Sequence, residues 1–200
     1  MCQGNCTINL PWDNYGTLHD LVAASLVIVI ANVTATSTSF IVAGPNGIPM
    51  SATTGYPVTH YNVTVVQTLK GNSNLTAGTV LSVGQLGGKS GNATFHLKGY
   101  PTLKIGQTYI FFLGDMYSSV GVAFGQSAVT VGGPQGLFYI QTGKVYSLDN
   151  MYPQADAWLP VKAAGVPISQ FISEVETNST SSTSTVSSST TGSSSTTGSS

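Results

Sequence analysis

The sequence predicts a mainly β fold: a small closed or partly open barrel with one short N-terminal helix and one C-terminal helix. Apolar residues recur with a period of two in several stretches, as they do in strands that bury one face. Clusters of Gly, Pro and Asn separate these stretches and are typical of turns. Charged residues make up only 6% of the 200 residues, against about 25% in an ordinary soluble protein. Ser, Thr, Asn and Gly must therefore make the surface polar.

Residues 1–14 are expected to form a separate N-terminal segment, which contains both cysteines, Cys2 and Cys6. In an exported chain they could close a small local disulfide loop, which constrains little because few residues lie inside it. Pairing with another chain and a reactive role are the alternatives. A CxxxC spacing without a nearby His is a weak metal signal, so we expect neither a metal nor another cofactor.

Residues 15–176 are predicted to form the folded domain, which begins with a short helix. Thr17 is a suitable N-cap for that helix, LHDLVAAS, and a strand over 26–36 follows it. Residues 37–57 are rich in Gly and Pro and indicate a long connection with one short strand over 40–42.

A hairpin over 61–88 is expected at the centre of the domain. Its first strand places four apolar residues on one face, and only Val66 and Gln67 interrupt the alternation. Turn residues follow, and a second strand over 79–85 is expected to fold back on the first. The four apolar residues are Tyr61, Val63, Val65 and Leu69.

The second half of the domain is predicted to add more strands and a closing helix. A short strand is expected within 87–101, and the continuous apolar run over 109–113 indicates a central strand. Two further strands are expected over 120–131 and 137–146. Pro167 then begins an amphipathic helix, whose apolar residues are Ile168, Phe171, Ile172 and Val175.

The composition changes abruptly at residue 177. Ser and Thr account for 20 of the 24 residues over 177–200, and such a tract cannot form a hydrophobic core. We expect a disordered stalk of the O-glycosylated kind that holds a domain away from a surface. A plain linker to another domain is the alternative.

Six Asn-X-Ser/Thr motifs suggest a glycoprotein, provided that the chain crosses a membrane. The opening residues lack the features of a signal peptide, so export requires that the sequence be a mature segment. We expect an extracellular or cell-surface location, with a membrane reached only through a removed C-terminal anchor. The six candidate sites are Asn5, Asn32, Asn62, Asn74, Asn92 and Asn178.

Several segments together resemble a known group of domains. They are LVIVIANVT, YNVTVVQTLKGN, TVLSVGQLGG, GYPTLKIGQTYIFFL, GGPQGLFYI and PISQFISEV. Over about residues 15–175 their order is similar to that of secreted bacterial and archaeal domains whose OB-like barrel resembles the tissue inhibitors of metalloproteinases. The resemblance implies an OB-like fold and an extracellular module, and it implies no particular ligand.

The inhibitor resemblance also implies one specific activity. In that family an N-terminal Cys chelates the zinc of the protease, and Cys2 would be N-terminal if Met1 were absent from the mature chain. The family's further disulfides are missing here, and CQGNC differs from its Cys-X-Cys opening. The inhibitor hypothesis therefore depends on Cys2 alone.

The sequence predicts no catalytic site. His19, His60 and His96 are scattered without an HxH or HxxxH pairing, and neither GxSxG nor a phosphate-loop motif is present. Six Lys, no Arg and a net charge of −1 also leave no basic stripe for nucleic acid.

Aromatic residues in loop-like contexts are the remaining candidates for a binding surface. They could line a contact with carbohydrate or protein, although packing against the core is the more frequent role of such residues. These candidates are Tyr56, Tyr117, Tyr152 and Trp158.

We therefore expect a non-catalytic module at the cell surface that serves surface structure, adhesion or partner binding. Its partner would be a protein or a carbohydrate. The alternatives are a metalloprotease inhibitor that acts through Cys2 and a filament subunit that donates its N-terminal segment to the sheet edge of a neighbour.

Overall fold

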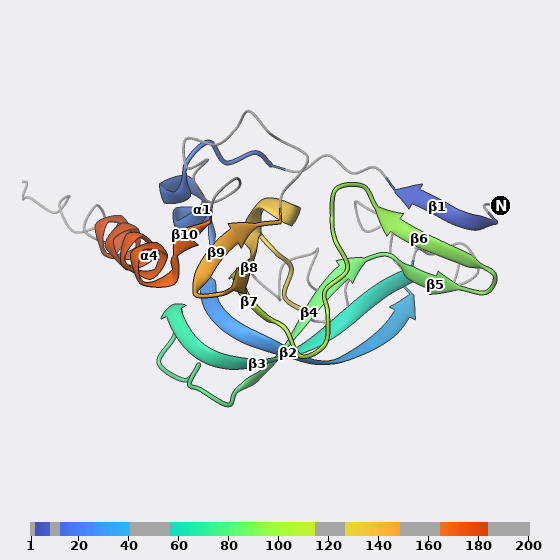
Figure 1. The fold of residues 1–200 in the computed structure, drawn as a ribbon, viewed down its shortest axis with the longest axis horizontal. Helices are drawn as coiled ribbons and strands as arrows, with labels where there is room; N and C mark the ends of the chain where they lie inside the picture. Colours follow the sequence, from blue (N-terminus) through green and yellow to red (C-terminus); the bar gives the residue numbers. More distant parts are fainter. Residues whose placement is uncertain (1–2, 9–12, 41–56, 115–126, 149–164, 184–200) are drawn as a thin grey trace, which may run out of the picture.

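A computed structural model of the chain describes residues 3–8, 13–40, 57–114, 127–148 and 165–183 (Figure 1). Over these residues the fold is mainly β with two α-helices, as the sequence predicts. Five residues that the sequence singles out lie outside the described residues. They are Cys2 and the four candidates for a binding surface, Tyr56, Tyr117, Tyr152 and Trp158.

The strands form two sheets. The larger sheet contains β2 (Val27–Phe40), β3 (Pro57–Lys70), β4 (Val80–Leu86), β7 (Thr108–Leu113), β8 (Leu137–Gln141), β9 (Lys144–Ser147) and β10 (Val166–Pro167). Its order is β10-β9-β8-β7-β2-β3-β4, and all neighbours are antiparallel. The smaller sheet contains β1 (Gly4–Ile8), β5 (Gly88–Ser90) and β6 (Ala93–Leu97). In it β6 is central and pairs parallel with β1 and antiparallel with β5.

The sheets of the described residues are not closed into a barrel, so the expected closed or partly open barrel is not supported. The outermost strands of the larger sheet, β10 and β4, do not pair with each other, and the smaller sheet is separate. The physical reason lies after β4, where the chain passes directly into β5 and starts a second sheet. Figure 1 shows the curved larger sheet with the small sheet at one end and both helices at the other.

Strand β2 buries both of its faces and thereby joins two hydrophobic clusters. Val29, Ala31 and Val33 pack on one face of the larger sheet with residues of β3 and β7. Ile28 and Ile30 pack on the other face, beneath the helices. The first half of this strand is therefore buried on both sides.

The predicted alternation of β3 is confirmed only in its first half. Tyr61, Val63 and Val65 share the first cluster, whereas Leu69 packs in the second. The pairing between β2 and β3 shifts between Ile30 and Ala31, where Val65 and Gln67 are the successive partners. The extra residue is a β-bulge, which reverses the faces of the residues that follow.

The two helices pack together at one end of the larger sheet (Figure 1). Helix α1 (Leu18–Ala24) is capped as predicted, because Thr17 Oγ1 accepts a hydrogen bond from the Asp20 amide at 3.1 Å. Helix α4 (Ile168–Thr183) buries Phe171 and Val175 completely. In the described part of the chain, neither helix has the length and apolar character required to cross a membrane.

Helix α4 is longer than the sequence suggests, because it continues to Thr183 instead of ending near residue 176. The side chains of Thr177 and Ser179 each donate to the carbonyl four residues earlier, at 2.8 Å. Asn178 Nδ2 donates to the Glu174 carbonyl at 2.8 Å as well. These local bonds satisfy the polar side chains of the Ser/Thr-rich segment within the helix. The expected stalk boundary at 177 therefore lies inside a helix, and residues 184–200 are outside the described residues.

Three other boundaries differ from the prediction. Strand β2 extends to Phe40, four residues into the expected loop over 37–57. The strand expected over 137–146 is a hairpin, β8 and β9, with a turn at Thr142 and Gly143, both of which have positive φ. Of the strand expected over 120–131, the described residues make only single bridges at Ala128 and Thr130.

Candidate functional site

A recess lies where the chain passes from the larger sheet into the smaller one. Gly87 and Gly88 join β4 to β5 and have φ values of 122° and 133°, which favour glycine. A Cβ atom at Gly87 would lie 2.9 Å from the Phe95 carbonyl oxygen, and one at Gly88 would lie 2.9 Å from Thr59 Oγ1. Two glycines are therefore needed for the sheets to approach this closely, and the approach forms the recess.

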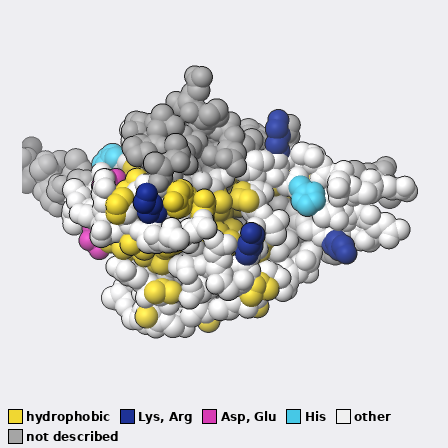
Figure 2. Space-filling view, viewed as in Figure 1, with side chains coloured by type: hydrophobic (Ala, Val, Ile, Leu, Met, Phe, Trp, Pro, Cys, Tyr) yellow, Lys and Arg dark blue, Asp and Glu magenta, His cyan; other side chains and the backbone are white. Residues whose placement is uncertain are grey.

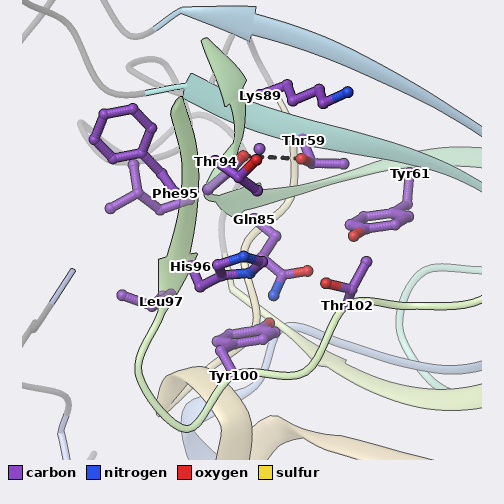
Figure 3. A pocket seen from close by; sticks show the side chains of 13 residues that line it. Thr59, Tyr61, Gln85, Lys89, Thr94, Phe95, His96, Leu97, Tyr100 and Thr102 are labelled. Atoms are coloured by element: carbon purple, nitrogen blue, oxygen red, sulfur yellow. Dashed lines mark hydrogen bonds between the residues drawn. The ribbon is translucent and has the colours of Figure 1, made fainter. Parts of the chain in front are cut away.

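The recess has a volume of about 170 Å³ and takes residues from both sheets (Figure 3). Thr59 and Tyr61 come from β3, Gln85 from β4, and His96 from β6. The segment after β6 adds Tyr100 and Thr102. The junction between the sheets thus brings together residues that lie far apart in the sequence, from Thr59 in β3 to Thr102.

Gln85 is the most unusual residue of the recess. Its side chain is only 7% exposed. Its Nε2 atom donates to the Pro101 carbonyl at 3.1 Å, whereas its buried Oε1 atom has no hydrogen-bond partner among the described residues. A buried acceptor left unpaired costs about 1–3 kcal/mol. The recess therefore contains an acceptor that a donor from outside the chain would satisfy.

The two tyrosines of the recess have buried side chains, and their hydroxyl groups are engaged within the fold. The Tyr100 hydroxyl is hydrogen-bonded to Thr130 Oγ1, and burial raises the Tyr100 pKa above its ordinary value. Burial also raises the pKa of Tyr61, and a backbone hydrogen bond from Leu103 opposes this shift. Both phenols stay neutral at physiological pH.

The charge around the recess is slight. Lys89 is the one Lys among its lining residues, and no Asp or Glu lines it. Over the face shown in Figure 2, the charged side chains are few and separate from one another. In the described residues, no three His, Cys, Asp or Glu side chains are grouped so that they could hold a metal ion.

The three histidines lie in three different places. His96 is exposed at the recess, whereas His19 Nδ1 lies 3.2 Å from Asn178 Oδ1 and links α1 to α4. His60 lies between two serine hydroxyls, with its Nε2 next to Ser39 and its Nδ1 2.8 Å from Ser127. The structure does not bring the histidines together.

The contacts of His60 extend into an array of hydroxyl groups. Ser127 is completely buried, and its Oγ also lies 2.7 Å from Ser82 Oγ. Burial lowers the pKa of His60, so its imidazole is neutral at pH 7. A hydrolytic triad places a carboxylate at the second imidazole nitrogen, but here Ser127 occupies that place. The array is a cross-strand polar ladder that contains a Ser–His contact.

The six candidate glycosylation sites fall into two groups. The first group has exposed side chains and comprises Asn5, Asn62, Asn74 and Asn92. In the second group, Asn32 is half-buried in a central strand and accepts a hydrogen bond from Thr108 Oγ1. Asn178, also half-buried, is hydrogen-bonded to Glu174 and His19.

The cysteine predictions can be followed only for Cys6. This residue is buried in β1 and is not a free thiol. Because Cys2 lies outside the described residues, the local disulfide and the zinc-chelating role of Cys2 stay predictions.

The recess is not predicted from the sequence, although two features of the sequence point to it. Gln85 occupies a position of β4 whose neighbours are buried, which is unusual for an amide in an edge strand. The Gly87–Gly88 pair follows at once and marks a close approach of two backbone segments. What could not be read from the sequence is that β6 and Tyr100 would lie opposite Gln85.

No protein-family model matches this chain, and no curated protein matches it. The resemblance to inhibitor-like domains therefore stays a prediction.

Proposed function

We propose that this chain is a non-catalytic, exported and glycosylated β module, displayed at a cell surface on its Ser/Thr-rich C-terminal tract, where it binds a partner. The recess between the two sheets is the proposed binding site. The observation that supports binding most strongly is that Gln85, whose buried Oε1 atom has no hydrogen-bond partner among the described residues, lines a recess of about 170 Å³. Concave sites with a few placed polar groups are typical of ligand binding.

Composition and surface support the exported part of the proposal. The chain has 6% charged residues, so its solubility must depend on neutral polar groups, to which glycans would add. Four candidate glycosylation sites, Asn5, Asn62, Asn74 and Asn92, have exposed side chains. These asparagines are accessible to a glycosyltransferase without disruption of the fold.

The polar groups of the described residues support a non-catalytic role. The Ser–His contact between Ser39 and His60 has a hydroxyl, Ser127, where a triad has its carboxylate. We expect that a fluorophosphonate probe, which labels activated serines, leaves Ser39 unmodified. Labelling that is lost in His60→Ala would contradict the non-catalytic proposal.

Peptide mass mapping of the protein secreted by a glycosylating host tests the exported part. We expect glycans on the exposed group Asn5, Asn62, Asn74 and Asn92. We expect none on Asn32, because its side chain is bonded to Thr108 within a central strand. The same spectra report the true N-terminus and the Cys2–Cys6 disulfide. Glycans on none of the exposed sites, or glycan on Asn32 in folded protein, would contradict the proposal.

One observation favours a second candidate function, a filament subunit that donates a strand. Strand β1 lies at the N-terminus and has a single neighbour, β6. An N-terminal edge strand of this kind can exchange with the same strand of another copy. Light scattering after size-exclusion chromatography distinguishes the two functions. Oligomers that disappear when residues 1–8 are deleted would favour strand donation, whereas a monomer at all concentrations would exclude it.

A further inference from the structure

We infer that the recess binds one sugar ring of a saccharide, with Gln85 Oε1 as the acceptor for a sugar hydroxyl. The inference rests on the proposed binding function and names the ligand class of the same site. It follows from four features of the recess: its unpaired acceptor, its aromatic walls, its charge and its size.

The acceptor is fixed in orientation. Gln85 Nε2 donates to the Pro101 carbonyl at 3.1 Å, and the opposite orientation of the amide would place two acceptors against each other. Oε1 must therefore be the atom without a partner. Figure 3 shows the Gln85 amide between His96 and Thr102 in the recess. A ligand that satisfies this atom must donate an O–H or N–H group.

The walls of the recess combine ring faces with hydroxyl groups. The phenol groups of Tyr61 and Tyr100 are engaged elsewhere. Tyr61 is only 1% exposed and Tyr100 9%, so of the two only Tyr100 leaves part of its side chain open to a ligand. Thr94 and Thr102 add hydroxyl groups, and His96 adds an exposed ring. A pyranose matches this combination because it has C–H groups on its ring faces and hydroxyl groups around its edge.

Charge and size narrow the ligand further. No carboxylate lines the recess and Lys89 does, so a cationic ligand would not be held, and a neutral or acidic sugar would. The volume of about 170 Å³ is below the ~300–1,000 Å³ of pockets that hold drug-sized ligands. One ring fits, with the rest of a saccharide outside.

A protein partner is less well matched to the recess. Stable protein interfaces have an apolar centre within about 800 Å² on each partner. The large apolar side chains that are most exposed in the described residues are Leu26, Val66, Val80 and Ile105. None of these four lines the recess. A polar saccharide needs no such surrounding surface.

The test uses the full chain, made in a host that adds no N-glycans, so that its own sugars cannot compete. A printed array of neutral and uronic-acid saccharides gives the best-binding sugar, which is then titrated against isotope-labelled protein by NMR. We expect saturable binding, with shifts of the backbone amides of Gln85, His96 and Thr102.

Two variants and one control locate the binding. Gln85→Met keeps the side-chain length and removes the acceptor, and we expect about tenfold weaker binding, the effect of one hydrogen bond. His96→Ala changes an exposed residue and therefore keeps the fold, and we expect a several-fold loss. Gln67→Met makes the same amide-to-thioether change at an exposed position of β3 outside the recess. We expect it to bind as the wild type does.

The outcomes separate the inference from the proposed function. If no saccharide binds, or if binding is unchanged in His96→Ala, the saccharide inference is overturned. If in that case a purified cell-surface protein binds the wild type and does not bind His96→Ala, the binding function stands and the recess accepts a protein side chain. If neither saccharide nor protein binds, the recess holds only water and the proposed function fails as well.

Discussion

Two glutamines are buried in the described residues, and they differ in how many of their amide atoms are hydrogen-bonded. Gln135 is completely buried, and both ends of its amide are used: Oε1 accepts from the Tyr15 amide at 3.0 Å, and Nε2 donates to Asn14 Oδ1 at 2.9 Å. Gln85 uses its Nε2 atom and leaves Oε1 unpaired. Gln135 therefore ties the segment before α1 to the short 3-10 helix Gly133–Gly136. Gln85 keeps one hydrogen-bond acceptor unused.

This difference predicts that one substitution changes stability much more at Gln135 than at Gln85. Gln135→Met should lower the free energy of unfolding by about 1–3 kcal/mol, because the Tyr15 amide and Asn14 lose their partner. Gln85→Met removes an unpaired acceptor as well as one hydrogen bond, so its change should lie within about 1 kcal/mol of zero. Urea denaturation of both variants measures the two values. A larger loss for Gln85→Met would mean that its Oε1 atom has a structural partner.

His60 predicts a pH dependence of stability. Burial lowers its pKa in the folded state below that of the unfolded chain, so the unfolded state binds a proton first as the pH falls. The contribution is fully present above about pH 6.5, the unfolded pKa, and is lost as the pH falls toward the lower folded pKa.

Thermal unfolding between about pH 7.5 and pH 5 tests this assignment. The melting temperature of the wild type should fall more over this range than that of His60→Gln, which cannot take up the proton. Ser39 and Ser127, the hydrogen-bond partners of His60, are neutral throughout. Equal falls in the two proteins would show that another group is responsible.

At the scale of single elements, the sequence predicts which helices and strands form better than it predicts where they end. Both helices were predicted, because Thr17 is a cap and the apolar spacing after Pro167 is helical. The length of α4 was underestimated, because Ser and Thr have low helix propensity, while their bonds to preceding carbonyls appear only in three dimensions. The reversal of faces at Val66 could not be predicted either, since a bulge is defined by the pairing with β2.

The close approach of the two sheets at Gly87 and Gly88 predicts that a substitution there lowers stability. Gly87→Ala should destabilise the protein by at least about 3 kcal/mol, because its Cβ would meet the Phe95 carbonyl oxygen at 2.9 Å in addition to the strain of positive φ. Gly91→Ala is the control, since Gly91 also has positive φ but no atom within 4 Å of its Cβ position. It should cost only about 1–2 kcal/mol. Equal losses in denaturant unfolding would show that the sheets can separate at this point without cost.

At the scale of the whole molecule, the predicted mainly β class is confirmed, whereas the described strands do not close into the predicted barrel. Alternating residues such as Val29 and Ile30 report which faces are buried, and this strand buries both. They do not report which strand pairs with which edge, because that depends on contacts between distant segments. The recess was missed for the same reason, as Gln85 and Tyr100 meet only after both sheets have formed.

The sharing of β2 by both hydrophobic clusters predicts cooperative unfolding. Phe171→Ala removes a buried ring that contacts Phe138, with 5.0 Å between ring centroids, and it should cost about 3–5 kcal/mol. Because β2 joins the clusters, tyrosine fluorescence and circular dichroism should still report one coincident transition. The control Ile105→Ala, at a residue 62% exposed, should change stability by less than about 0.5 kcal/mol. Two separated transitions in Phe171→Ala would mean that the clusters fold independently.

The continuation of α4 into the Ser/Thr-rich tract determines where a mechanical load would enter the molecule. Tension on the tail reaches α4 first, and the packing of Val175 and Phe171 and the contact between Asn178 and His19 resist it. The ladder between β2 and β3 lies behind them and bears the load only after the helix has been pulled away. The helix would thus detach from the sheet before the sheets unfold, and the recess between them would stay intact.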